Sequence, residues 1–315
     1  MLSPSNEIVF YFKGAGKTTV VPTLLLNDMI ETGVGCNANI WVTQPRRISA
    51  IAVAERIASE RGEKVGETCG YSIKLERKCS SRTRITLCTT GILLRRLQCD
   101  PDLANISHLI IDEVHERDLN SDFALIILKD LLQRRKNLKL ILMSATFEKS
   151  IFSSYFSGCA IVEIPGRAHP VREYRLEDVL ELTGYEVQDG SDCALNDRSD
   201  NSVKWSKTAL KKLYHPKYSS KTIHSLSIVD ESKINYEIVT LLVEHLTLHS
   251  EDGAILIFMP GMAEISNIID ELRKIELFRS DKVIIYPLHS SLASTDQSKV
   301  FLVPPIGTRK IVVVR

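Results

Sequence analysis

The sequence of 315 residues lacks the features of membrane and secreted proteins. Its apolar residues never form a run of roughly 18, the length that a membrane-spanning helix needs. The opening residues, Met1 to Phe12, lack the basic start and small-residue cleavage site of a signal peptide. The seven cysteines include no C-x-x-C pair, so neither a disulfide framework nor a zinc site is indicated. We therefore expect a protein of the cytoplasm or nucleus with reduced thiols and no membrane association.

An excess of either charge is also missing. The 40 basic and 39 acidic residues leave a formal net charge of +1. Net charge therefore gives no indication of nucleic-acid binding, and any basic surface has to be local. At roughly 100–200 residues per domain, the length predicts two domains, which we expect at residues 1–166 and 167–315.

Short apolar runs alternate with segments of helical period through the first half of the chain. The expected strands are Ile8–Phe12, Asn39–Thr43, Arg84–Cys88, His108–Ile111, Leu138–Met143 and Ala160–Ile164. The expected helices are Thr18–Thr32, Ile48–Arg61, Gly91–Gln98 and Ser121–Arg135. This alternation predicts an α/β fold whose mostly parallel sheet is covered by helices on both faces. Ligands of such sheets bind at the carboxyl ends of the strands.

The pattern breaks near residues 167–170, and residues 185–221 are polar and weakly periodic. The lysines of this stretch are Lys207, Lys211, Lys212, Lys217 and Lys221. We expect a solvated loop there, with an RNA-contacting insertion as the alternative. Order returns with an expected helix at Ile234–Thr247 and expected strands at Ala254–Phe258, Val283–Pro287 and Lys310–Val314.

A glycine-rich segment, Gly14 to Thr19, lies between an expected strand and an expected helix. Backbone N–H groups and a helix N-terminus in this setting suit a phosphate. In such a loop Lys17 reaches the β- and γ-phosphates of a nucleotide, and Thr18 holds Mg²⁺. The first glycine of the pattern G-x-x-x-x-G-K-[ST] is absent, because Tyr11 occupies its position. Taken alone, the segment is equally consistent with an ordinary glycine turn.

Two adjacent carboxylates, Asp112 and Glu113, follow the expected strand His108–Ile111. Such a pair suits metal-assisted phosphoryl transfer, in which one carboxylate holds Mg²⁺ and the next orients or deprotonates the attacking water. By itself, an acidic pair is more often part of a solvated loop. The zinc-protease motif H-E-x-x-H is excluded, because Leu119 stands where its second histidine is required.

Three further short motifs follow strands of their own. T-Q-P-R-R begins at Thr43 and offers arginines to phosphate, T-T-G begins at Thr89, and S-A-T begins at Ser144. Each motif is weak alone, but their order with the glycine-rich segment and D-E-V-H is specific. A P-loop ATPase unrelated to nucleic acid, or a purely structural α/β protein, leaves that order unexplained.

These motifs, within the segments TQPRRISAIAVAERIASERGE, CTTGILLRRL, SHLIIDEVHERDLNSDF and LILMSATFEKSIFSSYF, resemble the DEAH-box branch of superfamily 2 RNA helicases. IPGRAHPV, GAILIFMPGMAEI and YPLHSSL extend the resemblance over nearly the whole chain. It implies two RecA-like P-loop domains and an ATP-dependent RNA helicase. The ligands it implies are ATP, Mg²⁺ and RNA; it identifies no protein partner.

The resemblance also implies roles for single residues. Those implied to hold the nucleotide are Gly14, Gly16, Lys17, Thr18 and Thr19, with Arg56 and Phe301 on either side of adenine. Thr18 and Asp112 would hold Mg²⁺, and Glu113 would activate water. The residues implied to couple ATP to domain movement are His115, Ser144 and Thr146. Those implied to contact RNA are Arg47, Thr90, Gly261, His289 and Ser290.

The chain departs from the family's pattern at both ends. The family reads G-E-T-G-x-G-K-T, and here the first glycine and the acidic residue are missing. The last expected strand stops at Arg315, before the T-N-I-A-E-T segment and the Q-R-x-G-R-x-G-R arginines. Such arginines contribute about 10³–10⁵ in rate in comparable enzymes. We therefore expect a truncated chain with an incomplete second domain and impaired activity; a catalytically silent ATP- and RNA-binding fragment is the alternative.

Overall fold

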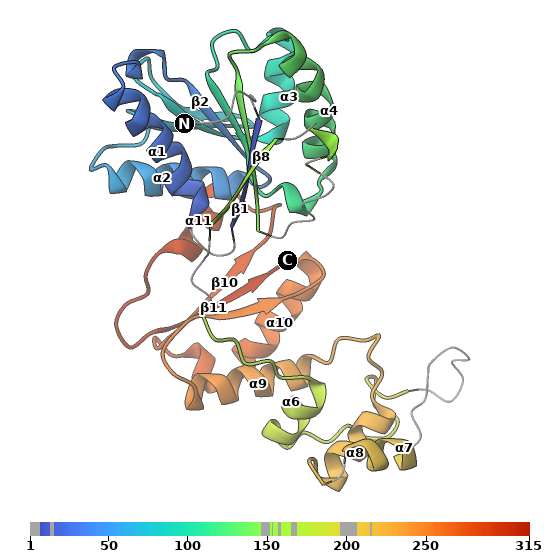
Figure 1. Cartoon of the computed structure of the whole chain (residues 1–315). Coiled ribbons are helices and arrows are strands. Elements are labelled where there is room, and N and C mark those ends of the chain that lie inside the picture. The colour runs from blue at the N-terminus through green and yellow to red at the C-terminus, as the bar shows by residue number, and fades with distance from the viewer. Residues whose placement is uncertain are drawn as a thin grey trace. The chain divides into compact units, whose positions relative to one another are not determined.

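The computed structural model describes residues 7–12, 16–145, 152, 154–156, 159–164, 169–195, 207–214 and 216–315. The chain divides into two compact units, Met1–Pro170 and Val171–Arg315 (Figure 1). Among the described residues, none of the helices combines the length and apolar character needed to cross a membrane.

The first unit contains a sheet that has eight strands in its described part, in the order β4-β3-β5-β2-β6-β7-β1-β8. Their bounds are β1 Glu7–Phe12, β2 Ile40–Gln44, β3 Cys69–Ile73, β4 Glu76–Lys78, β5 Ile85–Thr89, β6 His108–Ile111, β7 Lys139–Ser144 and β8 Ala160–Ile164. Neighbouring strands are parallel except β3 and β4, which form an antiparallel hairpin. The expected mostly parallel sheet is confirmed, but the sequence did not predict the hairpin.

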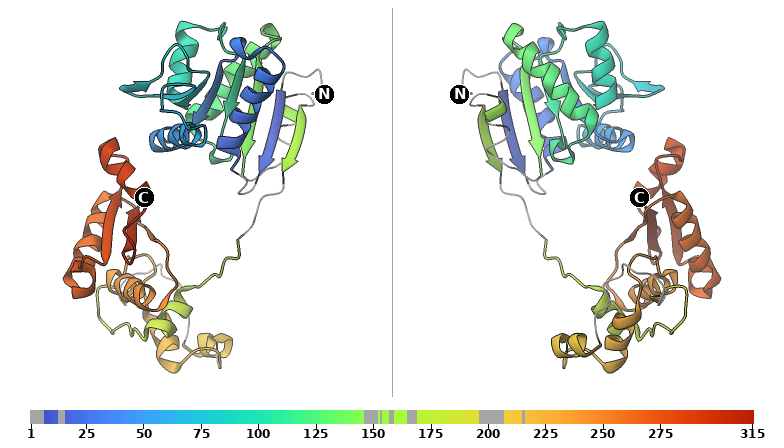
Figure 2. Two further views of the ribbon diagram at one scale, coloured as in Figure 1. Left: turned by 90° about the vertical axis from the view of Figure 1, so that its left-hand side faces the viewer. Right: turned by 90° about the vertical axis from the view of Figure 1, so that its right-hand side faces the viewer.

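Helices cover both faces of this sheet (Figure 2). They are α1 Lys17–Glu31, α2 Arg47–Glu60, α3 Thr90–Cys99 and α4 Leu119–Arg134, with the short 3-10 helices η1 Gly35–Asn37 and η2 Val114–Glu116. Successive strand side chains point to opposite faces. Leu109 and Ile111 therefore pack with α3 and α4, whereas Ile110 packs with α1 and α2. Both faces carry an apolar core, as the expected α/β architecture requires.

The second unit holds a smaller parallel sheet in the order β10-β11-β9. Its strands are β9 Ile255–Phe258, β10 Val283–Leu288 and β11 Arg309–Val314. Its α-helices are α6 Leu176–Thr183, α7 Lys207–Tyr214, α8 Ser220–Ile228, α9 Tyr236–His249, α10 Met262–Lys274 and α11 Ser294–Ser298. The 3-10 helices are η3 Glu276–Arg279 and η4 Lys299–Phe301. Val243 of α9 and Ile265 of α10 pack with Ile257 and Ile311 in the core.

The loop expected over residues 185–221 is wrong for α7 and for the start of α8. Leu210, Tyr218 and Ile223 are buried in a small cluster, against which Tyr214 also packs. Leu210 and Tyr214 are four residues apart and share one helix face. The helix could not be predicted from this polar segment, because two apolar positions are too few to give a clear helical period.

Two of the lysines in that stretch have acidic partners. The Nζ atom of Lys217 lies 3.3 Å from Asp178, and that of Lys221 lies 2.5 Å from Glu186. These pairs reduce the local positive charge that an RNA-contacting insertion would need.

Candidate active site

Three motifs meet at the carboxyl edge of the large sheet. The parallel strand β7 lies between β6 and β1. Asp112 follows β6, Ser144 ends β7, and α1 begins at Lys17, which follows β1 in the sequence. The topology therefore brings together residues from opposite ends of the first unit's sequence.

The start of α1 depends on a glycine. Gly16 caps the helix with φ 65° and ψ 23°, in the left-handed region that glycine adopts without a steric cost. Its carbonyl accepts the N–H of Thr19 at 3.2 Å and that of Val20 at 3.1 Å. The Thr19 hydroxyl also donates to this carbonyl, at 3.1 Å. Gly14 lies outside the described residues.

Asp112 is the centre of the site. The Thr18 hydroxyl donates to its Oδ2 at 2.6 Å, and Gln44 Nε2 donates to the same oxygen at 2.8 Å. Its Oδ1 accepts the backbone N–H of Glu113 at 2.8 Å. Burial raises the pKa of Asp112 above its ordinary value, although the hydrogen bonds from Thr18 and Gln44 act against this. Gln44 was not among the predicted site residues, although it stands within T-Q-P-R-R.

Lys17 is buried against both carboxylates. Its Nζ lies 3.0 Å from Glu113 Oε2 and 3.8 Å from Asp112 Oδ1. With both acids ionised, one positive charge faces two negative ones, so a bound cation would balance the remaining negative charge. The Thr18 hydroxyl and the Asp112 carboxylate are hard oxygen donors, which fit Mg²⁺. Among the described residues no group of three His, Cys, Asp or Glu side chains could hold a metal ion, so further ligands would be phosphate or water oxygens.

Glu113 adopts an unusual backbone conformation for a side-chain-bearing residue. Its φ is 55° and its ψ 38°, a left-handed geometry that costs on the order of 1–3 kcal/mol. Arg117, at φ 50°, closes the same short turn and holds Asp122 through two parallel bonds of 2.9 and 2.8 Å. Asp118 then caps α4 by accepting the backbone N–H of Asn120 at 3.0 Å. These contacts support a turn that directs the Glu113 side chain to Lys17.

His115 connects the carboxylate pair to the end of β7. The backbone N–H of Ala145 donates to His115 Nδ1 at 3.2 Å, and Glu113 Oε2 lies 3.3 Å from the same nitrogen. While Nδ1 accepts from Ala145 it carries no proton, so its contact with Glu113 is not an ion pair. Ser144 is buried beside this link, and Thr146 lies outside the described residues.

Arg47 and Thr90 line a pocket of about 410 Å³. Lys74 and Arg95, which the sequence did not single out, line it too. Thr90 is buried, and its hydroxyl lies 3.3 Å from that of Ser121, so its side chain also has a structural role. Lys74 escaped prediction because it stands in the unpredicted hairpin turn between β3 and β4.

Two expected RNA-contacting segments follow strands of the second unit. Gly261 precedes α10 after β9, and His289 and Ser290 follow β10. Since β9 and β10 flank β11 in a parallel sheet, both segments lie at its carboxyl edge. His289 Nδ1 lies 2.8 Å from the Ser291 hydroxyl.

The residues expected beside adenine belong to different units. Arg56 lies on α2 of the first unit, where it is exposed and pairs with Glu60 at 2.6 Å. Phe301 ends η4 of the second unit, with 57% of its surface exposed. The adenine role of both residues stays a prediction.

Residues 2–153 match the family described as DEAD/DEAH box helicase. "Putative ATP-dependent RNA helicase DHX57" of Homo sapiens is 42% identical over 342 residues, which cover 95% of this chain and 25% of that protein. "DExH-box ATP-dependent RNA helicase DExH1" of Arabidopsis thaliana is 43% identical, covering 95% and 31%. "ATP-dependent DNA/RNA helicase DHX36" of Homo sapiens is 41% identical, with the same coverage. The chain thus spans about a quarter to a third of the length of these curated relatives.

Proposed function

The chain belongs to the DEAD/DEAH box helicase family, and from that premise we propose that it binds ATP with Mg²⁺ and couples ATP hydrolysis to RNA remodelling. One observation carries the proposal. Lys17 and Thr18, in the first turn of α1, directly contact the carboxylates Asp112 and Glu113. A lysine, a hydroxyl and two carboxylates at a helix N-terminus are the groups that phosphoryl transfer requires.

Nucleotide binding would use the N-terminus of α1 and Lys17. The N–H groups at the start of α1 and the helix dipole attract phosphate. A phosphate would compete with Glu113 and Asp112 for the ammonium group of Lys17. Releasing Glu113 from Lys17 would free its carboxylate to orient or deprotonate the attacking water.

Thr18 and Asp112 would hold Mg²⁺ together with phosphate oxygens. Bound there, the ion would neutralise charge that develops on the phosphates. The Gln44 and Glu113 backbone hydrogen bonds keep the Asp112 carboxylate in one orientation. His115 contacts both Glu113 and the backbone N–H of Ala145, so a movement of the Glu113 side chain would alter the contact with Ala145.

RNA would bind the first unit at the pocket that contains Arg47, Lys74 and Arg95. Asp118 is the acidic residue that lines this pocket, and its carboxylate is engaged in capping α4. The local charge is therefore positive even though the whole chain is nearly neutral.

A second candidate is an ATP- and RNA-binding protein without turnover. Tyr11 favours it, since this residue lies within β1 and pairs with Ser144, where the family's phosphate loop has its first glycine. A strand that continues through this position leaves fewer residues for the loop that surrounds the phosphates.

Measuring both ATP binding and ATP turnover on one preparation distinguishes the two candidate functions. Fluorescent-nucleotide titration measures binding, and phosphate release with and without single-stranded RNA measures turnover. RNA-stimulated release supports the helicase motor, whereas binding without release supports the second candidate. Failure to bind ATP would refute both.

Two charge-removing variants test the assignments. Lys17→Met should weaken nucleotide binding, while Lys64→Met, which alters an exposed lysine outside the site, should not. Arg47→Gln should weaken RNA binding and reduce its salt dependence by about 0.7 per lost phosphate contact.

A further inference from the structure

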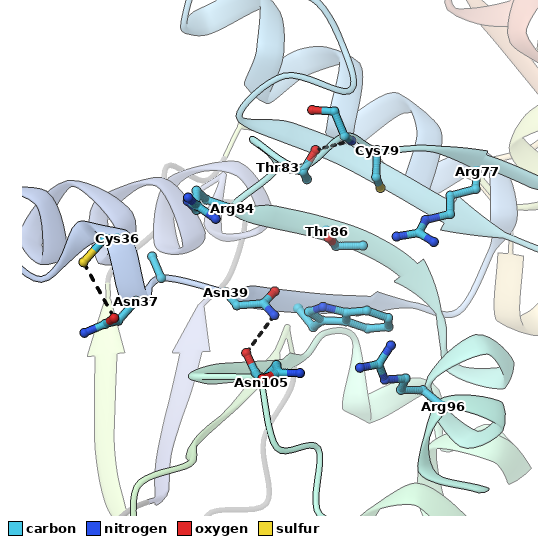
Figure 3. Close-up of a pocket in the computed structure, with 13 residues that line it drawn as sticks. Cys36, Asn37, Asn39, Arg77, Cys79, Thr83, Arg84, Thr86, Arg96 and Asn105 are labelled. Atoms are coloured by element: carbon cyan, nitrogen blue, oxygen red, sulfur yellow. Dashed lines mark hydrogen bonds between the residues drawn. The ribbon is translucent and has the colours of Figure 1, made fainter. Parts of the chain in front are cut away.

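A second depression lies on the first unit, at the other end of its strands. It has a volume of about 450 Å³ (Figure 3). Asn39 and Arg84, which precede β2 and β5, line it with Trp41, Arg77 and Arg96. Because the candidate active site lies at the carboxyl ends of the strands, this depression at their amino ends is a separate site.

The depression is strongly basic. Arg77, Arg84 and Arg96 line it, and no Asp or Glu does so among the described residues. In the part of the chain that the structure describes, the side chains of Arg77 and Arg84 make no hydrogen bond or ion pair. Two unpaired guanidinium groups in one depression favour an anionic ligand, since nothing else there offsets their charge.

Arg96 adds a buried polar atom to this site. Its Nη2 lies 3.4 Å from Asp100, but its Nε is buried and has no hydrogen-bond partner among the described residues. Buried donors are normally satisfied, so this one is an exception in the wall of the depression. Figure 3 shows Arg77 and Arg96 reaching into the same space from different elements.

Trp41 adds an aromatic surface. The Arg96 guanidinium carbon lies 5.7 Å from the centre of its ring, within cation–π range. Aromatic rings and arginine planes together stack nucleic-acid bases, and arginine also binds phosphate. Asn39 and Asn105 add amide groups. The Asn39 amide is held in place, because its Nδ2 donates to the backbone carbonyl of Asn105 at 2.7 Å. The chemistry fits a nucleotide unit better than a simple anion.

A third pocket, of about 310 Å³, joins this depression to the one at Arg47. It shares Trp41 and Arg77 with the former and Ile92 and Arg95 with the latter. The three pockets follow β5 from its carboxyl to its amino end, about 13 Å at 3.3 Å per residue. We call them the arginine track, lined by Arg47, Lys74, Arg95, Arg96, Arg77 and Arg84.

We propose that one RNA strand bound at Arg47 continues along the arginine track and ends in the depression lined by Trp41, Arg77 and Arg84. There a base stacks on Trp41, and phosphates pair with Arg77 and Arg84. Continuity with the Arg47 pocket selects a strand over a free nucleotide. The inference rests on the RNA binding proposed above and extends it to residues outside the helicase motifs.

The test uses short and long fluorescent single-stranded RNAs, about 4 and about 16 nucleotides, the ends of the range for single-stranded binding folds. The variant Arg77→Gln/Arg84→Gln removes two charges from the far end of the track. Lys64→Gln/Arg82→Gln removes two exposed charges that line none of the three pockets. Trp205→Phe leaves Trp41 as the sole tryptophan, whose fluorescence reports stacking. Circular dichroism confirms that each variant folds.

We expect the Arg77/Arg84 variant to bind the long RNA roughly tenfold more weakly near 0.1 M salt, with its salt slope reduced by about 1.4. Its binding of the short RNA and both affinities of the control variant should match the parent. The long RNA should quench Trp41 fluorescence more than the short one.

Other results overturn the inference. The Arg77/Arg84 variant could bind both RNAs as tightly as the parent does, while Arg47→Gln weakens the binding of both. This result would leave the proposed function intact and refute the arginine track. Quenching of Trp41 by free uridine monophosphate as effective as by RNA would make the pocket a mononucleotide site instead. Absence of RNA binding by the parent would refute the RNA-binding function and the inference that rests on it.

Discussion

The hydroxyl of Thr18 donates a 2.6 Å hydrogen bond to Asp112, which joins the first turn of α1 to the end of β6 across 94 positions of sequence. Since Gln44 donates to the same carboxylate oxygen, three separate segments meet there. The bond places a hydroxyl and a carboxylate where one metal ion can contact both. It is the geometric basis of the proposed ATP site.

Replacing Thr18 by Val should lower ATP turnover by about 10²–10³-fold, the usual loss when one preorganised electrostatic group is removed. The cause is the missing oxygen ligand, so the variant should also need more Mg²⁺ for half-maximal turnover. Thr23→Val is the matched control, because the Thr23 hydroxyl donates only within α1, to the Thr19 carbonyl at 2.8 Å. Equal Mg²⁺ requirements for the two variants would contradict the metal role of Thr18.

Glu113→Gln should retain ATP binding and lose turnover by about 10²–10⁴-fold, the range for a general base. Glutamine has the same shape but cannot take a proton from water. Glu116→Gln is the control within the same motif; Glu116 pairs with the exposed Arg46 at 3.3 Å, and such pairs contribute little. Phosphate-release assays at saturating ATP measure both variants. Turnover of Glu113→Gln at the parent's rate would remove Glu113 from the chemistry.

Leu75→Asn should stabilise the first unit by about 0.5–1 kcal/mol. Leu75 is 98% exposed and adopts φ 68° in the β3–β4 turn, a conformation that asparagine tolerates better than leucine. No buried apolar surface is lost. Urea unfolding measures the change, and Leu119→Asn, at an exposed leucine without positive φ, should bring no gain. A loss of stability in Leu75→Asn would show that the leucine has an unrecognised contact.

Acid stability of the second unit should depend on Asp178. The backbone N–H of Arg175 and the Tyr218 hydroxyl donate to its carboxylate at 2.9 and 2.6 Å and lower its pKa from 3.8 to about 2. A lowered acid pKa stabilises the folded state above pH 3.8, and this contribution disappears as the pH falls through about 2. The stability difference between the parent and Asp178→Asn should therefore shrink over that interval.

Urea unfolding at a series of pH values measures this effect. Glu177→Gln, at the neighbouring carboxylate of the same first helical turn, is the control. Its unfolding free energy should stay parallel to that of the parent over the same interval. A constant gap between the parent and Asp178→Asn would show that the Asp178 contacts do not form in solution.

Local pattern predicted the first unit well. The expected strand Leu138–Met143 is β7, Lys139–Ser144, and the expected helix Ile48–Arg61 is α2, Arg47–Glu60. The spacing of apolar residues and the content of β-branched residues are local properties, so they can be recognised from the sequence alone. The hairpin of β3 and β4 escaped because β4 is a three-residue exposed strand, Glu76–Lys78, without an apolar side.

The sequence proposes residues for the candidate site but predicts none of the contacts between them. Motif order alone singled out Lys17, Thr18, Asp112 and Glu113. Gln44, the second donor to Asp112 Oδ2, was passed over because its neighbours in T-Q-P-R-R carry the charge. A buried amide has no sequence signature; its role appears only once its partner is placed.

The sequence by itself determined most strands and helices of the first unit, and that polar motifs follow several of these strands, because these depend on short-range period and residue type. Only the tertiary structure decided that β7 separates β6 from β1, that Lys17 lies between two carboxylates, and that Trp41, Arg77 and Arg84 share a pocket. Strand order and register arise from the packing of all the elements at once. Contacts between residues far apart in the chain are therefore a property of the folded molecule.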